Sequence, residues 1–469
     1  MALKLYNTMG RKVEEFKSIR DGYVGFYGCG PTVYNYAHIG NLRAYVFLDT
    51  LDRTLTFLGY DKKHVMNITD VGHLTGDSDD GDDKMVKTAE EKHQSVMEIA
   101  QFYTDAFFRD IDRLNIIRPD VVCKATDHIQ EMIDLIKKIE ANGHTYMAGG
   151  NLYFDVSTYK NYGDLANLNL DELKEGAGRR KEVVIDENKK NPQDFVLWFT
   201  KSKFENQALT WDSPWGRGYP GWHIECSGIS IKYLGEHLDI HGGGVDNIFP
   251  HHTNEIAQSE AYLGHKWCNY WFHNEHLMDD SGKMSKSKGA ILSVSRLIEE
   301  GYNPLAFKLM CLMSNYRKQL VFSYDILKQV EGAYNKLKNR ILAINDIGEL
   351  DTTKFGYYTD KFKEELSNDL NTANGITLIY DLLKDDSVNG HTKIEIINDF
   401  DKVFSLDLTK KTLNTSIDMD KYIKDKIEER RIAKMNKNYE LSDSIRDELL
   451  DKGIILTDTR EGTTYRIVK

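Results

Sequence analysis

The chain has 469 residues, of which 41% are apolar and 29% are charged, and its formal net charge is −12 at pH 7. This composition excludes a disordered chain, and no segment approaches the ~18 consecutive apolar residues of a membrane span. The first residues lack the apolar stretch of a signal peptide, and five scattered cysteines are too few for a disulfide framework. We therefore expect a cytoplasmic chain with reduced thiols and, at ~150 residues each, about two to four domains.

The N-terminal part of the chain predicts a strand, a helix and a second strand. Residues 22–29 form a short apolar run that ends at the turn Gly30-Pro31, and residues 63–68 form another such run. Between them, over residues 39–58, apolar side chains recur at helical spacing. This order is typical of a βαβ unit and predicts an α/β fold with a doubly wound, Rossmann-like parallel sheet. Ligands of such sheets bind beyond the carboxyl ends of the strands.

The middle of the chain predicts an interruption of this sheet. Residues 77–83 are an acidic loop without the ligand spacing of an EF-hand, so we interpret them as solvated surface. Residues 84–147 predict helices, whereas residues 151–204 mix strand-like runs with a charged, glycine-containing segment. Residues 237–241 then predict a strand and residues 250–263 a helix. The pattern indicates an insertion between two halves of one sheet domain.

The C-terminal third of the chain is predicted to be helical. Glycine becomes rare from about residue 326, and the last segment predicts a helix followed by two short strands. Residues 421–469 contain 12 Lys/Arg and 10 Asp/Glu, so this end carries +2 while the whole chain carries −12. The overall acidity argues mildly against nucleic-acid binding, but a local basic face is compatible with it.

Two segments have the composition of phosphate-binding sites. The string HIGN, residues 38–41, lies between the first strand and its helix, where free N–H groups and the helix dipole favour an anion. Gly40 lets the backbone approach, and His38 could donate a hydrogen bond. The string KMSKSK, residues 283–288, is a cationic loop between glycines that could close over a polyphosphate. Alone, the first string also fits a turn histidine without a role, and the second fits an ordinary charged loop.

A metal site is a third possibility. His251 and Glu255 are four residues apart on one predicted helix, so they share a face. Cys29 and Cys226 could complete a Cys₂-His-Glu set for zinc. Neighbouring His252 is turned by about 100° around that helix, so we expect it to face elsewhere. No CxxC pair supports the site, and inert buried cysteines are the alternative.

The combination of these motifs resembles one family. It comprises CGPTVYNYAHIGN (29–41), NITD (67–70), SPWGRGYPGWHIECS (213–227), HGGGVDNIFPHHTNEIAQS (241–259) and KMSKS (283–287). Together they resemble the cysteinyl-tRNA synthetases, which are class I aminoacyl-tRNA synthetases. Residues 445–466 also look like the end of that family, so the resemblance spans nearly the whole chain.

The resemblance implies a two-step reaction. Cysteine and ATP, with Mg²⁺, form cysteinyl-adenylate and pyrophosphate, and the cysteinyl group then passes to the 3′ end of tRNA-Cys. The catalytic residues that the resemblance implies are His38, Lys283 and Lys286. It assigns ATP to His38, Gly40, Asn41, Asp246 and Lys286, cysteine to Gly30, Thr69 and Trp222, and one zinc per chain to Cys29, Cys226, His251 and Glu255. Zinc would distinguish a thiol from a hydroxyl, which an apolar pocket separates only weakly.

One residue departs from the commonest family string. The first motif ends in Asn41, where that string has a histidine. Asparagine donates a hydrogen bond but carries no charge. This puts the role of position 41 in doubt, and not that of His38.

The resemblance also divides the chain into parts. The expected parts are the first half of the catalytic domain (1–150), a connective insertion (151–205), the second half with the KMSKS loop (206–290), a stem-contact region (291–325), a helical bundle (326–420) and an anticodon-binding module (421–469). The expected partners are tRNA-Cys, ATP and L-cysteine, with no membrane, and the expected assembly is a monomer.

Three alternatives stay open at this point. A cysteine:amino-sugar ligase of the mycothiol type resembles the same catalytic half, but it needs no helical region after residue 326. A non-catalytic RNA-binding paralogue has no need of the lysine loop or of four metal ligands. A zinc hydrolase needs a general base, for which Glu225 or Glu260 could serve, but it leaves the lysine loop unexplained.

Overall fold

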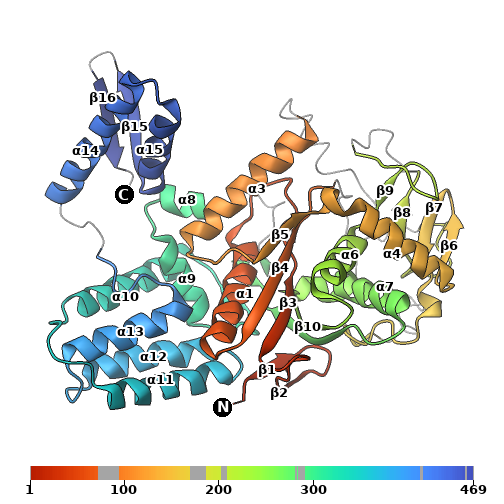
Figure 1. Cartoon of the computed structure of the whole chain (residues 1–469), viewed down its shortest axis with the longest axis horizontal. Coiled ribbons are helices and arrows are strands. Elements are labelled where there is room, and N and C mark those ends of the chain that lie inside the picture. The colour runs from red at the N-terminus through yellow and green to blue at the C-terminus, as the bar shows by residue number, and fades with distance from the viewer. Residues whose placement is uncertain are drawn as a thin grey trace.

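The structure, a computed structural model, describes residues 2–71, 95–168, 186–201, 209–279, 282–283, 291–411, 416–459 and 462–467. A central sheet lies between an inserted antiparallel sheet and a helical bundle, and a small C-terminal unit stands beside the bundle (Figure 1). Within these ranges, no helix is both long and apolar enough to cross a membrane.

The central sheet has the strand order β11-β10-β3-β4-β5, and each neighbouring pair is parallel. The strands are β3 (Tyr23–Gly28), β4 (Asp61–Ile68), β5 (Val121–Lys124), β10 (Leu238–Gly244) and β11 (Cys268–Asn274). Adjacent residues of a strand face opposite layers: Phe26 joins the core under α1 (Ile39–Phe57), and Tyr27 joins the core under α6 (Trp222–Leu234) and α7 (Thr253–Leu263). The predicted doubly wound parallel sheet is confirmed.

The segment predicted to be helical over residues 84–147 contains two strands as well. Two helices, α3 (Val96–Arg113) and α4 (Ile129–Ala141), are present as predicted. However, β5 lies between them and β6 (Thr145–Ala148) follows α4. A strand of four residues is too short to show an alternating pattern, and tertiary pairing with β4 decides its conformation. Residues 77–83 lie outside the described residues.

The inserted part forms an antiparallel sheet of the order β6-β7-β8-β9. Its further strands are β7 (Asn151–Phe154), β8 (Phe195–Phe199) and β9 (Tyr219–Pro220). The apolar face of this sheet packs against α4 and α6 in a core of its own. The predicted strand-like runs of this region are therefore strands. The sheet also takes in β6 and β9, which lie outside residues 151–205, whereas the domain boundaries themselves stay a prediction.

Short elements connect the sheet to the bundle. An N-terminal hairpin consists of β1 (Lys4–Asn7) and β2 (Lys12–Glu15). After β11 come β12 (Leu277–Asp279) and β13 (Gly282–Lys283), which are antiparallel, and β12 also pairs in parallel with β14 (Leu320–Val321). Between β13 and β14 lie α8 (Val294–Glu299) and α9 (Pro304–Leu312). Single helical turns span Ala125–His128, Val156–Thr158 and Val245–Asn247.

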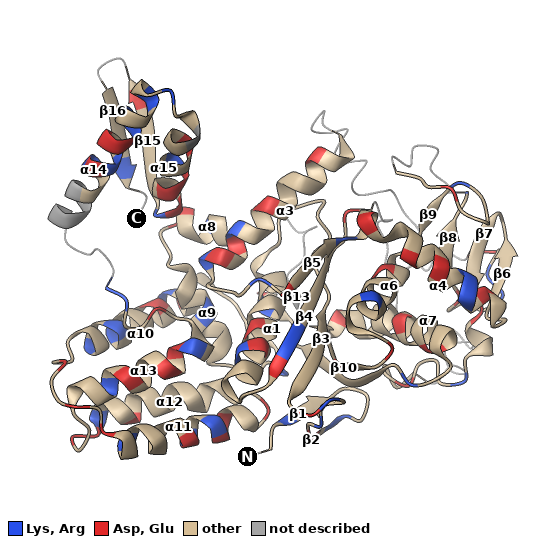
Figure 2. Ribbon diagram, viewed as in Figure 1, with Lys and Arg blue, Asp and Glu red and all other residues tan. Residues whose placement is uncertain are grey.

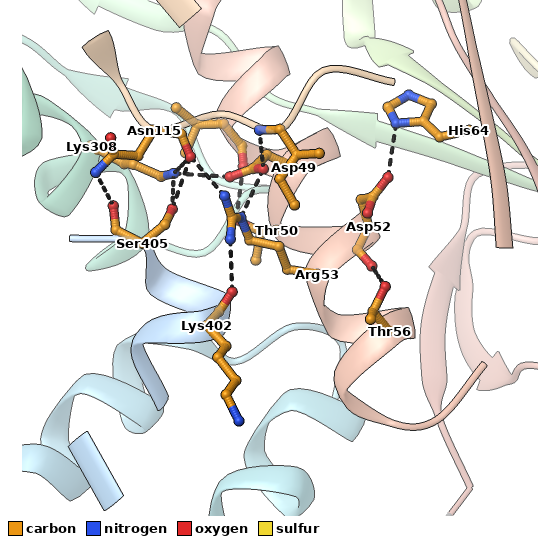
Figure 3. A network of polar contacts seen from close by, with 12 residues as sticks. Asp49, Thr50, Asp52, Arg53, Thr56, His64, Asn115, Lys308, Lys402 and Ser405 are labelled. Atoms are coloured by element: carbon orange, nitrogen blue, oxygen red, sulfur yellow. Dashed lines mark hydrogen bonds and ion pairs between the residues drawn. The ribbon is translucent and has the colours of Figure 1, made fainter. Parts of the chain in front are cut away.

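The helical bundle shares one continuous apolar core with the α1 face of the sheet. It consists of α10 (Tyr324–Leu342), α11 (Thr352–Ser367), α12 (Thr372–Lys384) and α13 (Gly390–Phe404). A buried polar network also joins it to α1 (Figure 3). Asp49 of α1 accepts hydrogen bonds from Lys308 Nζ and Arg53 Nε, both at 2.9 Å. Lys308 also donates to the carbonyl of Asn115 at 3.2 Å and to Ser405, which follows α13.

The C-terminal unit has an apolar core of its own. It contains α14 (Ser416–Met435), α15 (Tyr439–Asp451), β15 (Ile454–Thr459) and β16 (Gly462–Ile467), as the terminal pattern predicts. Basic and acidic side chains are interspersed on both helices (Figure 2). Arg430 and Lys434 pair with Asp458, and Lys426 and Lys452 pair with Glu448. In each case two cations share one carboxylate, so these pairs neutralise the basic groups only in part.

Candidate active site and metal centre

The first motif closes the N-terminus of α1. His38 is the N-cap residue: its Nδ1 accepts the backbone N–H of Asn41 at 3.1 Å, and Asn41 Oδ1 accepts the backbone N–H of His38 at 3.3 Å. Because Nδ1 accepts, a neutral His38 carries its proton on Nε2 and can donate from there. Asn41 thus fulfils a capping role through its amide oxygen, which needs no charge.

A glycine turn brings the end of β3 against the end of β4. The backbone N–H of Gly30 donates to Asn67 Oδ1 at 2.9 Å. A Cβ at Gly30 would lie 1.5 Å from the carbonyl oxygen of Asn67, so only glycine fits. Asn67 also donates to the Thr69 hydroxyl, which in turn donates to Glu225 Oε2, both at 2.9 Å. Thr69 is therefore fixed where the carboxyl ends of the strands meet α6.

Four potential metal ligands converge behind this turn. One donor atom from each of Cys29, Cys226, His251 and Glu255 lies within 4.8 Å of all the others. The two Sγ atoms are 4.0 Å apart, and Cys226 Sγ lies 3.5 Å from His251 Nε2. Cys29 follows β3, Cys226 lies on α6, and Glu255 lies on α7. The structure thus brings together residues that are up to 226 positions apart in the sequence.

The donor set fits a metal such as zinc. Glu255 is fully buried, and its Oε2 accepts a hydrogen bond from His241 Nε2 at 2.8 Å. Its Oε1 accepts no hydrogen bond, although His251 Nε2 lies 3.1 Å away. A buried carboxylate oxygen without a hydrogen bond is costly unless a cation or proton satisfies it. Two thiols, one imidazole and one carboxylate are ligands that zinc takes in proteins.

The prediction that His252 faces elsewhere is wrong. His252 Nε2 lies 3.2 Å from Cys29 Sγ, and His252 belongs to a second candidate ligand set with Cys29, His241 and Glu255. The reason is the backbone before α7. Residues Ile248–His252 form a wide helical turn that contains the non-helical Phe249, and from it His251 reaches Cys226 while His252 reaches Cys29.

Further histidines extend this cluster. His252 Nδ1 lies 2.7 Å from His273 Nε2, and His223 Nδ1 lies 2.9 Å from His251 Nδ1. Sequence reasoning missed His223, His241 and His273 because each lies on a different element. The strings HGGG and PHH were the available signals, since polar residues within otherwise buried segments need partners.

Burial sets the proton affinities in the cluster. Burial lowers the pKa of His241 to about 4, because a charged imidazole would lose its hydration. Burial likewise raises the pKa of the Glu255 carboxyl well above its usual value. At Cys29 burial acts against ionisation, but hydrogen bonds from Cys226 and His251 outweigh it and hold the thiol pKa well below its usual value. A thiolate at Cys29 is the form in which sulfur binds a metal.

Three further predicted site residues are described, and the first of them, Gly40, lies in the first turn of α1. The Trp222 ring begins α6 and lies 4.4 Å from the His251 ring, measured between centroids. Asp246 follows β10, and its Oδ1 lies 3.9 Å from His276 Nδ1. Lys286 and the side chain of Lys283 lie outside the described residues, although the backbone of Lys283 ends β13.

Residues 15–332 match the family described as tRNA synthetases class I (C) catalytic domain. Over 99% of the chain, 52% of residues are identical to a cysteine–tRNA ligase of Treponema denticola, which is covered completely. The chain belongs to the cysteine–tRNA ligase family. A family member of Borrelia garinii subsp. bavariensis is 47% identical over 99% of the chain, and one of Brachyspira hyodysenteriae is 44% identical over 98%.

A solved structure supports the fold. The methionyl-tRNA synthetase of Mycobacterium tuberculosis, in complex with methionyl-adenylate, aligns with a TM-score of 0.56 at 13% identity. The alignment covers 82% of this chain and 91% of the other. The fold of this chain is therefore the fold of a class I synthetase, in agreement with its family.

Proposed function

We propose that this chain activates L-cysteine with ATP and transfers the cysteinyl group to the 3′ end of tRNA-Cys. The observation that carries the proposal is the convergence of Cys29, Cys226, His251 and Glu255 beside the capped N-terminus of α1. A thiol-reading site and a phosphate-binding helix end thus lie at the same edge of the sheet. Because the chain aligns with family members over nearly its whole length, we assign the reaction of that family to this combination of sites.

The phosphates of ATP would lie at the N-terminus of α1. The helix dipole favours their charge, and His38, the N-cap residue, would donate a hydrogen bond to them from Nε2–H. In the first step the cysteine carboxylate attacks the α-phosphorus, and the bond to pyrophosphate breaks. Lys283 and Lys286 would stabilise the charge that develops on the departing pyrophosphate, which Mg²⁺ accompanies. Catalysis in this account is positioning and charge stabilisation, without a general base.

Zinc would be held by Cys29, Cys226, His251 and Glu255. When bound, it supplies a soft Lewis acid that prefers a thiolate to a hydroxyl. His241 orients Glu255 by occupying Oε2, which leaves Oε1 for the metal. Trp222 covers His251, so this ring would exclude water from the substrate side of the cluster.

The remaining substrate contacts follow from the turns around this cluster. Thr69 is fixed through Asn67 and Glu225 next to the cluster and would contact the bound cysteine together with the Gly30 backbone. Asp246, after β10, would contact the ribose of ATP. The proposal also includes one zinc per chain, a monomer and a cytoplasmic location.

A cysteine:amino-sugar ligase is the nearest alternative. The bundle α10–α13 and the separate C-terminal unit favour a large acceptor such as tRNA, because an amino sugar gives these parts no ligand.

The acceptor is tested directly by incubating the enzyme with labelled cysteine, ATP and either tRNA-Cys or an amino sugar. Label that becomes acid-precipitable with tRNA-Cys, and not with tRNA of another specificity, is the expected result. Transfer to the amino sugar alone would refute the tRNA acceptor.

A further inference from the structure

Arg43 lies on α1, five residues after His38, and its side chain is completely buried. The described part of the chain offers its guanidinium no carboxylate partner: all four of its acceptors are backbone carbonyls. Nη1 donates to Glu275 and His276, each at 2.6 Å, and Nη2 donates to Lys318 at 2.6 Å and Asn315 at 3.4 Å. Burial lowers the pKa of this guanidinium, so the position is costly and needs a reason.

The acceptors of Arg43 stand at the start of two paired strands. Glu275 and His276 precede β12, and Lys318 lies two residues before β14, which pairs with β12 in parallel. Backbone hydrogen bonds join the two strands at this place. The N–H of Leu320 donates to the His276 carbonyl at 3.1 Å, and the N–H of Phe322 donates to the Met278 carbonyl at 2.7 Å. β12 in turn pairs with β13, whose last residue is Lys283. Arg43 therefore fixes the base of the strands that lead into the lysine motif.

Helix α1, which carries Arg43, also has the proposed phosphate site at its N-terminus. His38 caps α1, and the N–H of Ile39 donates to the carbonyl of Leu292, which follows the lysine motif, at 2.8 Å. At ~1.5 Å per residue, Arg43 lies about 7.5 Å along the helix from His38. One rigid helix thus connects the residue proposed to bind phosphate with the strands on both sides of the motif.

We infer that Arg43 is a positioning residue for cysteine activation: its guanidinium holds the start of β12 and β14 at a fixed place relative to His38. Only arginine suits this task, because its planar fork reaches several carbonyls at once, whereas a lysine ammonium is a single point. The inference rests on the proposed function.

The test compares variants at the two ends of the same helix. Arg43→Lys keeps the charge and the stem, and Arg43→Met removes both donors. Arg53→Met is the matched control, since Arg53 also lies on α1 and donates to the carbonyls of Lys402 at 2.9 Å and Asn115 at 2.8 Å, on the bundle side. Thermal stability, zinc content and cysteine-dependent ATP–pyrophosphate exchange are measured for each.

We expect both Arg43 variants to lower kcat of the exchange at least about tenfold, because small misplacements of reacting groups are costly. Zinc content and the KM for cysteine should change less than about twofold, since none of the four proposed zinc ligands lies on β12 or β14. Arg53→Met should lose comparable thermal stability and keep its kcat within about twofold. Equal losses of kcat in Arg43→Lys and Arg53→Met at equal stability would refute positioning, and so would an unchanged kcat in the Arg43 variants.

A second readout does not depend on activity. Hydrogen exchange at the amides of Leu320 and Phe322 should accelerate at least about tenfold in Arg43→Lys and stay unchanged in Arg53→Met. Unchanged protection of these amides from hydrogen exchange in both variants would contradict the role proposed for Arg43. If the unsubstituted enzyme shows no cysteine-dependent exchange, the proposed function fails, while the hydrogen-exchange comparison still decides the role of Arg43.

Discussion

Glu255 shows how a single side chain can carry two tasks. One of its oxygens is occupied by His241, and the other faces the thiols of Cys29 and Cys226 without a hydrogen bond. The buried imidazole therefore decides which oxygen is left for a metal. This division of tasks accounts for a fully buried carboxylate in the catalytic half of the molecule.

The zinc assignment is tested by Cys226→Ser, with Cys268→Ser as the control. Both thiols are buried to the same degree, but Cys268 lies on β11 and donates to the carbonyl of Tyr270 instead. Cys226→Ser should lower both zinc content and cysteine affinity at least about tenfold, because a serine oxygen replaces a metal-binding thiolate. Removing zinc from the unsubstituted enzyme with a chelator should lower cysteine affinity to a similar extent. Unchanged zinc and affinity in Cys226→Ser, or equal losses in Cys268→Ser, would contradict the assignment.

The buried carboxyl of Asp110, which lies outside the candidate site, makes the free energy of unfolding depend on pH. Burial raises the pKa of this carboxyl from 3.8 to about 6, and the Arg113 guanidinium opposes the rise only in part. The folded protein therefore holds a proton that the unfolded chain has released, so stability falls as pH rises from about 4 to about 6. This difference corresponds to about 3 kcal/mol.

The variant Asp110→Asn isolates this effect, since asparagine resembles the protonated acid at every pH. Denaturant unfolding should give the variant nearly the stability of the unsubstituted protein at pH 4.5. At pH 7.5 the variant should be the more stable of the two. A difference in stability that is the same at both pH values would rule out this origin.

At the scale of elements, the Lys308–Asp49 pair joins α9 to α1, and Lys308 also donates to Ser405, which follows the last helix of the bundle. Both side chains are completely buried, so removing one leaves a charge with fewer partners in a dry environment. Lys308→Met should therefore lower the free energy of unfolding by about 3 kcal/mol. Lys402→Met is the control: its exposed ammonium pairs with Asp399 at the surface, and its carbonyl still accepts from Arg53.

Denaturant titration of both variants checks this prediction. Lys402→Met should stay within about 0.5 kcal/mol of the unsubstituted protein, as exposed ion pairs usually do. Adding Asp49→Asn to Lys308→Met should recover part of the loss, because the unpaired charge is then removed. A Lys308→Met variant as stable as Lys402→Met would show that the pair does not hold these elements together.

The elements with a long, regular pattern were predictable from the sequence, and the irregular ones were not. α1 and β3 follow from apolar spacing and from the turn at Gly30, where only glycine fits. β5 was missed because four residues carry no period. His252 was misplaced because the backbone before α7 is not a regular helix, a fact that depends on tertiary packing.

At the site, the residues that lie within sequence motifs could be predicted. The residues whose partners are distant in the sequence could not. The four candidate metal ligands were named because each lies in a motif string, and in the structure one donor atom from each lies within 4.8 Å of the others. His241 and Arg43 were missed in their roles, because their partners are a carboxylate on another helix and distant backbone carbonyls. No local spacing encodes such contacts.

At the scale of the whole molecule, the bundle and the C-terminal unit differ in whether they share an apolar core with the central sheet. The bundle shares its core with α1, whereas the C-terminal unit packs around Ile423, Leu449 and Ile454 by itself. A cut near residue 325 would therefore divide a continuous core. A cut after residue 411 would remove only the C-terminal unit.

A chain that ends at residue 411 should keep its fold and cysteine-dependent ATP–pyrophosphate exchange within about threefold. Charging of tRNA-Cys by this shortened chain should fall at least about a hundredfold, because the proposed anticodon contacts are worth several kcal/mol. Charging assays with both chains at equal exchange activity check this. Full charging by the shortened chain would contradict an anticodon-binding role for the C-terminal unit.

The proposed function requires that this molecule activate cysteine and distinguish it from serine through its thiol. The most direct measurement is ATP–pyrophosphate exchange without tRNA, with cysteine or serine as the amino acid and with zinc content determined on the same sample. We expect exchange with cysteine and none above background with serine. Equal exchange with both amino acids, or none with cysteine in a folded, zinc-containing enzyme, would contradict it.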